Sequence, residues 1–138
     1  PICESGDFFC QDRDIADVFA TPPEELARLF WHDPANAPDF AHMTDAELEM
    51  VQANRVALGL YTWQPYMHNP KLPGRLHRID VPTLVIWGES DGLVTPNYGR
   101  ALCAMIPGAE MAIIPAAGHS PQAEQPDAFV RHVTSFAS

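Results

Sequence analysis

The fold follows from one stretch of sequence, Val81-Pro82-Thr83-Leu84-Val85-Ile86-Trp87-Gly88-Glu89-Ser90-Asp91. Its run of β-branched and aromatic residues begins after Pro82 and is closed by Gly88. The run is too short for a helix and predicts a fully buried, parallel strand over residues 83–87. Ligands of open parallel sheets bind beyond the carboxyl ends of the strands. Asp91 lies just past such an end and is therefore a candidate functional residue.

The rest of the C-terminal half continues this pattern. Thr95 and Pro96 predict the start of a helix that stops at Pro107-Gly108. Residues 110–115 predict a second strand, and Pro126 opens a last helix. This order of strand, helix, strand and helix predicts an α/β fold with parallel strands, because such crossovers are almost always parallel and right-handed.

The first half of the chain predicts helices. Thr21-Pro22-Pro23-Glu24 combines an N-cap hydroxyl with prolines in the first turn, and predicts a short helix that ends before Pro34. Thr44-Asp45-Ala46-Glu47 is a second capping box, and predicts a longer helix through Tyr61 with apolar residues on one side. We therefore expect a helical layer ahead of the strands.

Composition and charge exclude several classes of protein. The 138 residues are 46% apolar and 19% charged, which is typical of one soluble globular domain. The net charge of −10 would repel phosphate backbones and anionic lipid surfaces, so neither nucleic acid nor a membrane is an expected partner. No apolar run approaches the roughly 18 residues that a membrane-spanning helix needs.

The cysteines and histidines give no sign of a metal site. Cys3, Cys10 and Cys103 form no Cys-x-x-Cys pair, and the six histidines show no ligand spacing. We expect no metal ion, no cofactor and a reducing, cytoplasmic setting.

Two residues follow the two predicted strands. Asp91 lies four residues past Trp87, where the first predicted strand ends, and His119 lies five residues past Ile114, at the end of the second. The carboxyl ends of neighbouring parallel strands lie about 4.8 Å apart on one edge of a sheet. The two loops can therefore bring a carboxylate to an imidazole, which fixes the tautomer of the histidine and stabilises the imidazolium formed when it takes a proton.

These motifs resemble the last two strands and the final helix of the α/β-hydrolase family. The resemblance rests on residues 82–94, on Ile106-Pro107-Gly108-Ala109, and on Gly118-His119-Ser120-Pro121 with Glu124-Gln125-Pro126. It implies that Asp91 is the acid and His119 the general base of a catalytic triad. It also implies two segments, which are a helical lid over residues 1–75 and the C-terminal part of the hydrolase core over residues 76–138.

Ser90 lies in a misleading pattern. Gly88-Glu89-Ser90-Asp91-Gly92 fits Gly-x-Ser-x-Gly, the pattern of a nucleophile elbow. An elbow turns straight into a helix, whereas three residues separate Gly92 from Pro96. In the family the nucleophile also precedes the acid on an earlier strand. We therefore expect that Ser90 is not the nucleophile.

The nucleophile itself is missing from the sequence. No other elbow occurs, and no oxyanion-hole segment such as His-Gly-Gly is present. Two parallel strands do not make a stable sheet. We therefore expect the chain to be the C-terminal half of a larger hydrolase, to need the remainder of that core as its partner, and to be inactive alone. An apolar face along Leu84, Ile86 and Ile113 should then be exposed.

We expect the complete protein to hydrolyse a small apolar or aromatic substrate. A serine nucleophile would make it an esterase or a carbon–carbon hydrolase, and an aspartate would make it a dehalogenase or an epoxide hydrolase. A ligand-binding receptor of the same fold and a self-standing interaction domain are the other possibilities. The candidate substrate-binding residues are Trp63, Tyr66 and Met67, with Trp31, in the lid and Val94 beyond the acid.

Overall fold

The computed structural model describes residues 15–62 and 69–138. In chain order, its helices, 3-10 turns and strands are α1 (Pro23–Phe30), η1 (Pro34–Asn36), η2 (Phe40–His42), α2 (Asp45–Tyr61), α3 (Pro73–Leu76), β1 (Leu84–Gly88), α4 (Pro96–Ala104), β2 (Glu110–Ile114), α5 (Pro121–Glu124) and α6 (Pro126–Ala137). The expected order of helices followed by strand, helix, strand and helix is confirmed. The short elements η1, η2, α3 and α5 were not predicted.

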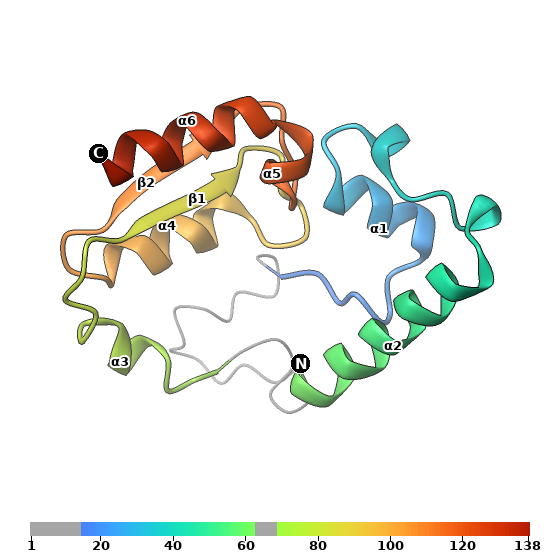
Figure 1. The fold of residues 1–138 in the computed structure, drawn as a ribbon. Helices are drawn as coiled ribbons and strands as arrows, with labels where there is room; N and C mark the ends of the chain where they lie inside the picture. The colour runs from blue at the N-terminus through green and yellow to red at the C-terminus, as the bar shows by residue number, and fades with distance from the viewer. Residues whose placement is uncertain (1–14, 63–68) are drawn as a thin grey trace.

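The sheet is built from β1 and β2, which pair in parallel from Leu84 opposite Glu110 to Gly88 opposite Ile114. Helices α4 and α6 pack against both strands and lie on opposite faces of the sheet (Figure 1). This is the layered α/β arrangement that the sequence predicts. Both strands end at the same level, so the loops that follow them leave the sheet side by side.

The strands are less buried than predicted. A fully buried strand was expected, but in β1 only Gly88 is buried and the other four residues are half-buried. In β2, Ala112 and Ile114 are buried. Within residues 15–62 and 69–138 the sheet has two strands, so each strand has one unpaired edge there. These open edges account for the partial burial.

The prediction of one exposed apolar face along Leu84, Ile86 and Ile113 is wrong. Successive side chains of a strand point to opposite faces. The register places Ile113 opposite Trp87, and therefore on the face away from Leu84 and Ile86. All three side chains are half-buried, because a helix covers each face. Helix α4 comes so close to the Trp87 face that a Cβ on Gly99 would lie 2.7 Å from the Trp87 ring.

The buried core lies between the sheet and its flanking elements. Its apolar members are Leu76, Leu93, Cys103, Ile106, Ala112, Ile114 and Ala117. The described part of the chain has no helix long and apolar enough to cross a membrane.

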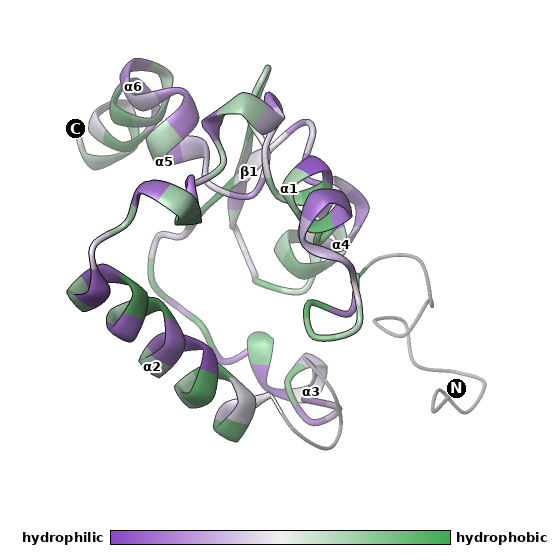
Figure 2. Cartoon of the chain, turned by 90° about the vertical axis from the view of Figure 1, so that its right-hand side faces the viewer, coloured by the Kyte–Doolittle hydropathy of each residue, from purple (hydrophilic) through white to green (hydrophobic). Residues whose placement is uncertain are grey.

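Helix α2 begins at the capping box that the sequence predicts. The backbone N–H of Thr44 donates to Glu47 Oε2 at 2.8 Å, and the N–H of Glu47 donates to Thr44 Oγ1 at 3.4 Å. The bonds from the Thr44 backbone and hydroxyl hold the pKa of Glu47 below its usual value. The helix buries none of its residues and stands apart from the sheet, with apolar and polar residues mixed along it (Figure 2). Its exposed apolar side chains are Leu48, Met50, Val51, Val56, Leu58, Leu60 and Tyr61.

The start of α1 differs from the prediction. The hydroxyl of Thr21 does not cap the helix, because it donates to the carbonyl oxygen of Asp17 at 2.6 Å. Pro22 occupies the N-cap position and the helix begins at Pro23. The carboxylate of Asp17 accepts two backbone N–H groups and closes a turn just ahead of the helix. The Thr21 hydroxyl is therefore bound within this turn, and it is not available as the N-cap of α1 that the sequence pattern predicts.

Gly88 gives a test of the sheet's close backbone packing. A Cβ at this position would overlap the carbonyl oxygens of Ala117 and Gly118, which are backbone atoms and cannot rotate away. We expect Gly88→Ala to lower the free energy of unfolding by about 1–3 kcal/mol in urea titrations. Gly74→Ala is the matched control, because a Cβ there would meet nothing within 4 Å. Equal stability of the two variants would contradict this packing.

Candidate active site

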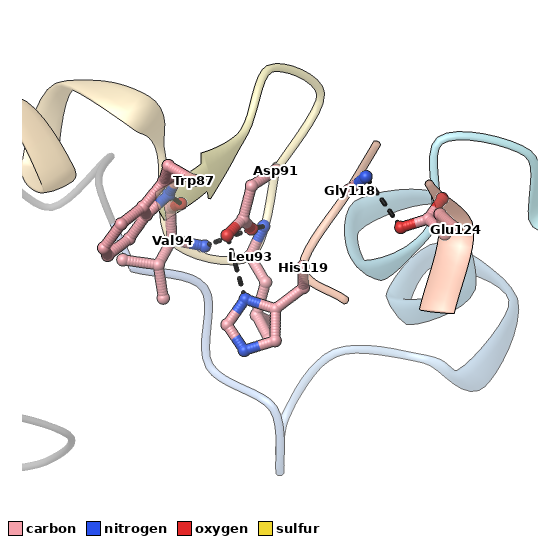
Figure 3. Close-up of polar contacts among 7 residues, drawn as sticks. All are labelled: Trp87, Asp91, Leu93, Val94, Gly118, His119 and Glu124. Carbon is pink, nitrogen blue, oxygen red and sulfur yellow. Dashed lines mark hydrogen bonds and ion pairs between the residues drawn. The ribbon is translucent and has the colours of Figure 1, made fainter. Parts of the chain in front are cut away.

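Asp91 and His119 meet beyond the carboxyl ends of β1 and β2. His119 Nδ1 lies 2.9 Å from Asp91 Oδ2 (Figure 3). A carboxylate only accepts hydrogen bonds, so Nδ1 carries the hydrogen in this contact. The other ring nitrogen, Nε2, points away from Asp91. The arrangement leaves Nε2 able to accept a proton from another group.

The carboxylate of Asp91 is held by the backbone of its own loop. Its side chain is 4% exposed, and its Oδ1 accepts the N–H groups of Leu93 at 3.0 Å and Val94 at 2.9 Å. A buried carboxylate is tolerated only when its oxygens find hydrogen-bond donors. These two donors and the histidine supply them, and they fix the direction in which Oδ2 points.

The loop that carries Asp91 is bound to its surroundings on both sides. Trp87 Nε1 donates to the carbonyl oxygen of Val94 at 2.9 Å, and the N–H of Ser90 donates to the carbonyl oxygen of Ala117 at 2.9 Å. The Trp87 ring packs near Tyr98, with centroids 6.3 Å apart, and burial raises the pKa of Tyr98. The loop after β1 is therefore anchored both to its own strand and to the loop after β2.

The last turn of α1 closes over both loops. The carbonyl oxygen of Leu29 accepts the N–H of Gly92 at 2.9 Å, and that of Phe30 accepts the N–H of His119 at 2.6 Å. The last four carbonyls of a helix have no partner within the helix. The two loops satisfy part of this need, and the Phe30 ring also meets the His119 imidazole edge-on at 4.9 Å. Sequence patterns gave no sign of these contacts.

Glu124 joins the same two parts of the molecule. Its Oε1 accepts the N–H of Gly118 at 2.7 Å, and its Oε2 accepts the N–H of His32 at 2.7 Å. The sequence motif contains Glu124, but it gives no role to the residue. The partner His32 lies 92 positions earlier in the chain, so no local pattern could identify it.

The hydroxyl of Ser90 contacts a histidine other than His119. Ser90 Oγ lies 2.8 Å from Nδ1 of His32, which is an exposed residue just after α1. The expectation that Ser90 is not the nucleophile stays a prediction.

The candidate substrate-binding residues are only partly described. Trp63, Tyr66 and Met67 lie outside the described residues. Val94 is half-buried beside Asp91. Trp31 is half-buried and packs on Phe30, with ring centroids 5.2 Å apart. The roles assigned to these residues in substrate binding stay predictions.

No metal site is formed by the part of the chain that the structure describes. There, no group of three or more histidine, cysteine, aspartate or glutamate side chains is placed to hold a metal ion.

Comparisons with known proteins agree on one family. The model of the "Alpha/beta hydrolase family" matches residues 2–132. A 2-hydroxy-6-oxononadienedioate/2-hydroxy-6-oxononatrienedioate hydrolase from Cupriavidus pinatubonensis is 34% identical over 117 residues, which are 82% of this chain and 39% of that protein. A pimeloyl-(acyl-carrier protein) methyl ester esterase from Nitrosospira multiformis is 28% identical over 113 residues, which are 82% of this chain and 36% of that protein.

A solved structure is also similar. It is a serine hydrolase involved in carbazole degradation, with a TM-score of 0.56 and 25% identity over 70% of this chain and 36% of that one. The match therefore spans less than two fifths of the length of each of the two named relatives, 39% and 36%.

The hydrogen bond between Asp91 and His119 predicts a particular tautomer. In two-bond proton–nitrogen NMR spectra of the folded protein at alkaline pH, we expect neutral His119 to carry its hydrogen on Nδ1. Asp91→Asn presents an amide that can donate to Nδ1, so the Nε2–H form should appear in that variant. His42, whose Nδ1 lies 2.7 Å from Asp39 at the surface, is the control within the same spectrum and should not change. An unaltered His119 tautomer in the variant would count against the contact.

Proposed function

The chain belongs to the alpha/beta hydrolase family, and from this membership we propose that Asp91 and His119 are the acid and the general base of its catalytic triad. One observation carries the proposal, which is the hydrogen bond between a buried carboxylate and a partly exposed imidazole. The side chain of Asp91 is 4% exposed and that of His119 is 35% exposed. A buried partner orients the ring, and the exposed part of the ring is open to a nucleophile.

In this mechanism His119 moves the proton twice. Its Nε2 takes the proton of the nucleophile's hydroxyl as the oxygen attacks the carbonyl carbon of the substrate, and Asp91 stabilises the imidazolium that forms. The imidazolium then gives this proton to the leaving group, and an acyl-enzyme remains. In the second half, a water molecule gives a proton to His119 Nε2 as it attacks the acyl carbon, and the imidazolium returns this proton to the oxygen of the nucleophile when the acid product leaves.

We place the nucleophile outside these 138 residues. Ser90 is the only serine of the sequence within a Gly-x-Ser-x-Gly pattern, and its hydroxyl is engaged by His32. The Cupriavidus relative is also much longer, since the matched segment is 39% of its length. These observations favour a nucleophile on the part of the core that this chain does not contain.

The same proposal divides the chain into residues 1–75, a helical lid, and residues 76–138, the C-terminal part of the core. The sheet has open edges in the described residues, which suits the addition of further strands. The apolar side chains that α2 leaves exposed suit contact with the rest of the hydrolase. The remainder of the core is therefore the partner that we propose for this chain.

We propose serine as the nucleophile, and a small ester or a carbon–carbon bond next to a carbonyl group as the target. The relatives support this choice, since they are named as a dienedioate hydrolase, a methyl ester esterase and a serine hydrolase. An aspartate nucleophile, as in dehalogenases and epoxide hydrolases, is the alternative. The residue at the centre of the elbow in the full-length protein distinguishes the two.

Substitutions in the full-length protein test the assigned roles. With a short-chain p-nitrophenyl ester as substrate, we expect Asp91→Asn and His119→Ala each to lower kcat by at least about 10³-fold. Ser90→Ala should change kcat by less than about threefold, because removing a group that takes no part in the chemistry leaves the transition state unaffected. Asp39→Asn is the matched control, because Asp39 forms a carboxylate–imidazole pair with His42 at the surface. A large loss in Ser90→Ala with little loss in Asp91→Asn would overturn the assignment.

A receptor of the same fold would behave differently in this assay. Many product molecules released per protein molecule would exclude a receptor in which turnover is incidental. Release of one equivalent or less would favour the receptor.

A further inference from the structure

We propose that Glu124 is a positioning residue of this hydrolase site, because its carboxylate holds the loop that carries His119 against the end of α1. The inference rests on the proposed function, since it assigns Glu124 a role through the proposed base. Glu124 does not touch the imidazole of His119 in any of the contacts described. Its influence on the reaction would pass through the backbone of the loop.

The contacts place Glu124 between two backbone segments. Both of its carboxylate oxygens accept a backbone N–H at 2.7 Å, one from Gly118 and one from His32. Gly118 immediately precedes His119, and His32 follows the last residue of α1 by two positions. Hydrogen bonds to a charged acceptor are roughly twice as strong as neutral ones. One carboxylate therefore sets the spacing between the base loop and the helix end.

The loop that carries His119 and the end of α1 approach each other closely at Gly118. A Cβ on Gly118 would overlap the carbonyl oxygen of Phe30 and would lie 2.9 Å from the backbone nitrogen of His32. The two segments thus touch backbone to backbone. The bond from the His119 N–H to the Phe30 carbonyl oxygen closes one side of this contact, and Glu124 closes the other.

Helix α5 places Glu124 next to the loop that precedes the helix and carries His119. The helix is a single turn, Pro121–Glu124, and Pro121 is buried. Its last N–H donates to the carbonyl oxygen of Ser120 at 3.0 Å. The next residue, Gln125, donates from its side chain to the carbonyl oxygen of Ala116 at 3.0 Å, which closes the loop. Glu124 therefore lies on a short segment, residues 116–125, which contains His119 and is closed by the contact between Gln125 and Ala116.

A change from carboxylate to amide removes one of the two contacts without changing the size of the side chain. Gln has one acceptor oxygen and an NH₂ group, whereas Glu124 meets two donors. One backbone N–H would then face another donor and lose its partner. The hydrogen bond between His119 and Asp91 is formed by other atoms, so it is not removed directly. Glu124→Gln should therefore weaken the hold on the loop that carries His119, while the hydrogen bond between His119 and Asp91 remains.

The test is steady-state kinetics of the full-length hydrolase with a short-chain p-nitrophenyl ester. We expect Glu124→Gln to lower kcat by about 10- to 100-fold, because a small misplacement of a reacting group has effects of this size. KM should change by less than about threefold, since the loss affects the transition state and not ground-state binding. Glu124→Asp keeps two acceptor oxygens and should recover part of kcat. Glu110→Gln, the same change at an exposed carboxylate, should leave kcat unaltered.

A second readout separates positioning from general loss of structure. In amide NMR spectra of Glu124→Gln, the N–H proton that loses its acceptor, that of Gly118 or that of His32, should move upfield, while resonances away from this contact stay in place. The folded fraction is measured by circular dichroism. If kcat per folded molecule returns to within twofold of the Glu110→Gln value, the role is only structural and the proposal is overturned.

His119→Ala in the same assay distinguishes failure of this inference from failure of the proposed function. If His119→Ala keeps its turnover, the assigned base is wrong and the positioning role falls with it. If His119→Ala is inactive but Glu124→Gln matches Glu110→Gln, only the positioning role is wrong.

Discussion

The parallel pairing of β1 with β2 is the constraint on which the rest of the structure depends. The register sets Gly88 opposite Ile114, so both strands end at one level of the sheet. The loops that follow therefore run side by side, and a few residues are enough for Asp91 to reach His119. A slip of one residue would turn every side chain of a strand to the other face. The close backbone approach of Gly88 to the loop after β2 leaves little room for such a slip.

A second layer of contacts joins the helical part of the chain to this edge of the sheet. The carbonyl oxygens of Leu29 and Phe30, at the end of α1, accept N–H groups from the two loops. Glu124 adds a second connection, because its carboxylate accepts the N–H of Gly118 in the loop after β2 and the N–H of His32 just after α1. Backbone groups at the end of α1 therefore attach this helix to the loop that carries Asp91 and to the loop that carries His119.

The sequence predicts the topology well because local signals encode it. Prolines, caps and short apolar runs locate the strands and most helices, and the parallel order then brings Asp91 near His119. The faces of the strands were not predictable, since the register that puts Ile113 opposite Trp87 depends on both strands together. The sequence predicts the Thr21 hydroxyl as an N-cap because the capping pattern begins at Thr21, whereas the carbonyl of Asp17, which the hydroxyl binds, lies four residues before it. The contacts of Glu124 are with two backbone N–H groups, one of them 92 positions away, and every residue type except proline provides such a group, so no sequence pattern identifies them.

Asp91 is held by backbone N–H groups, so the identity of the neighbouring side chain at Val94 does not enter these hydrogen bonds. The N–H of Val94 holds the carboxylate of Asp91, and its carbonyl oxygen holds the indole of Trp87, while its side chain is used by neither bond. Replacement of this side chain therefore leaves both backbone contacts, and the position of Asp91, available. Proline alone is barred, because it has no N–H to donate. Under the proposed mechanism, the side chain beside Asp91 can therefore change without moving the carboxylate that orients His119.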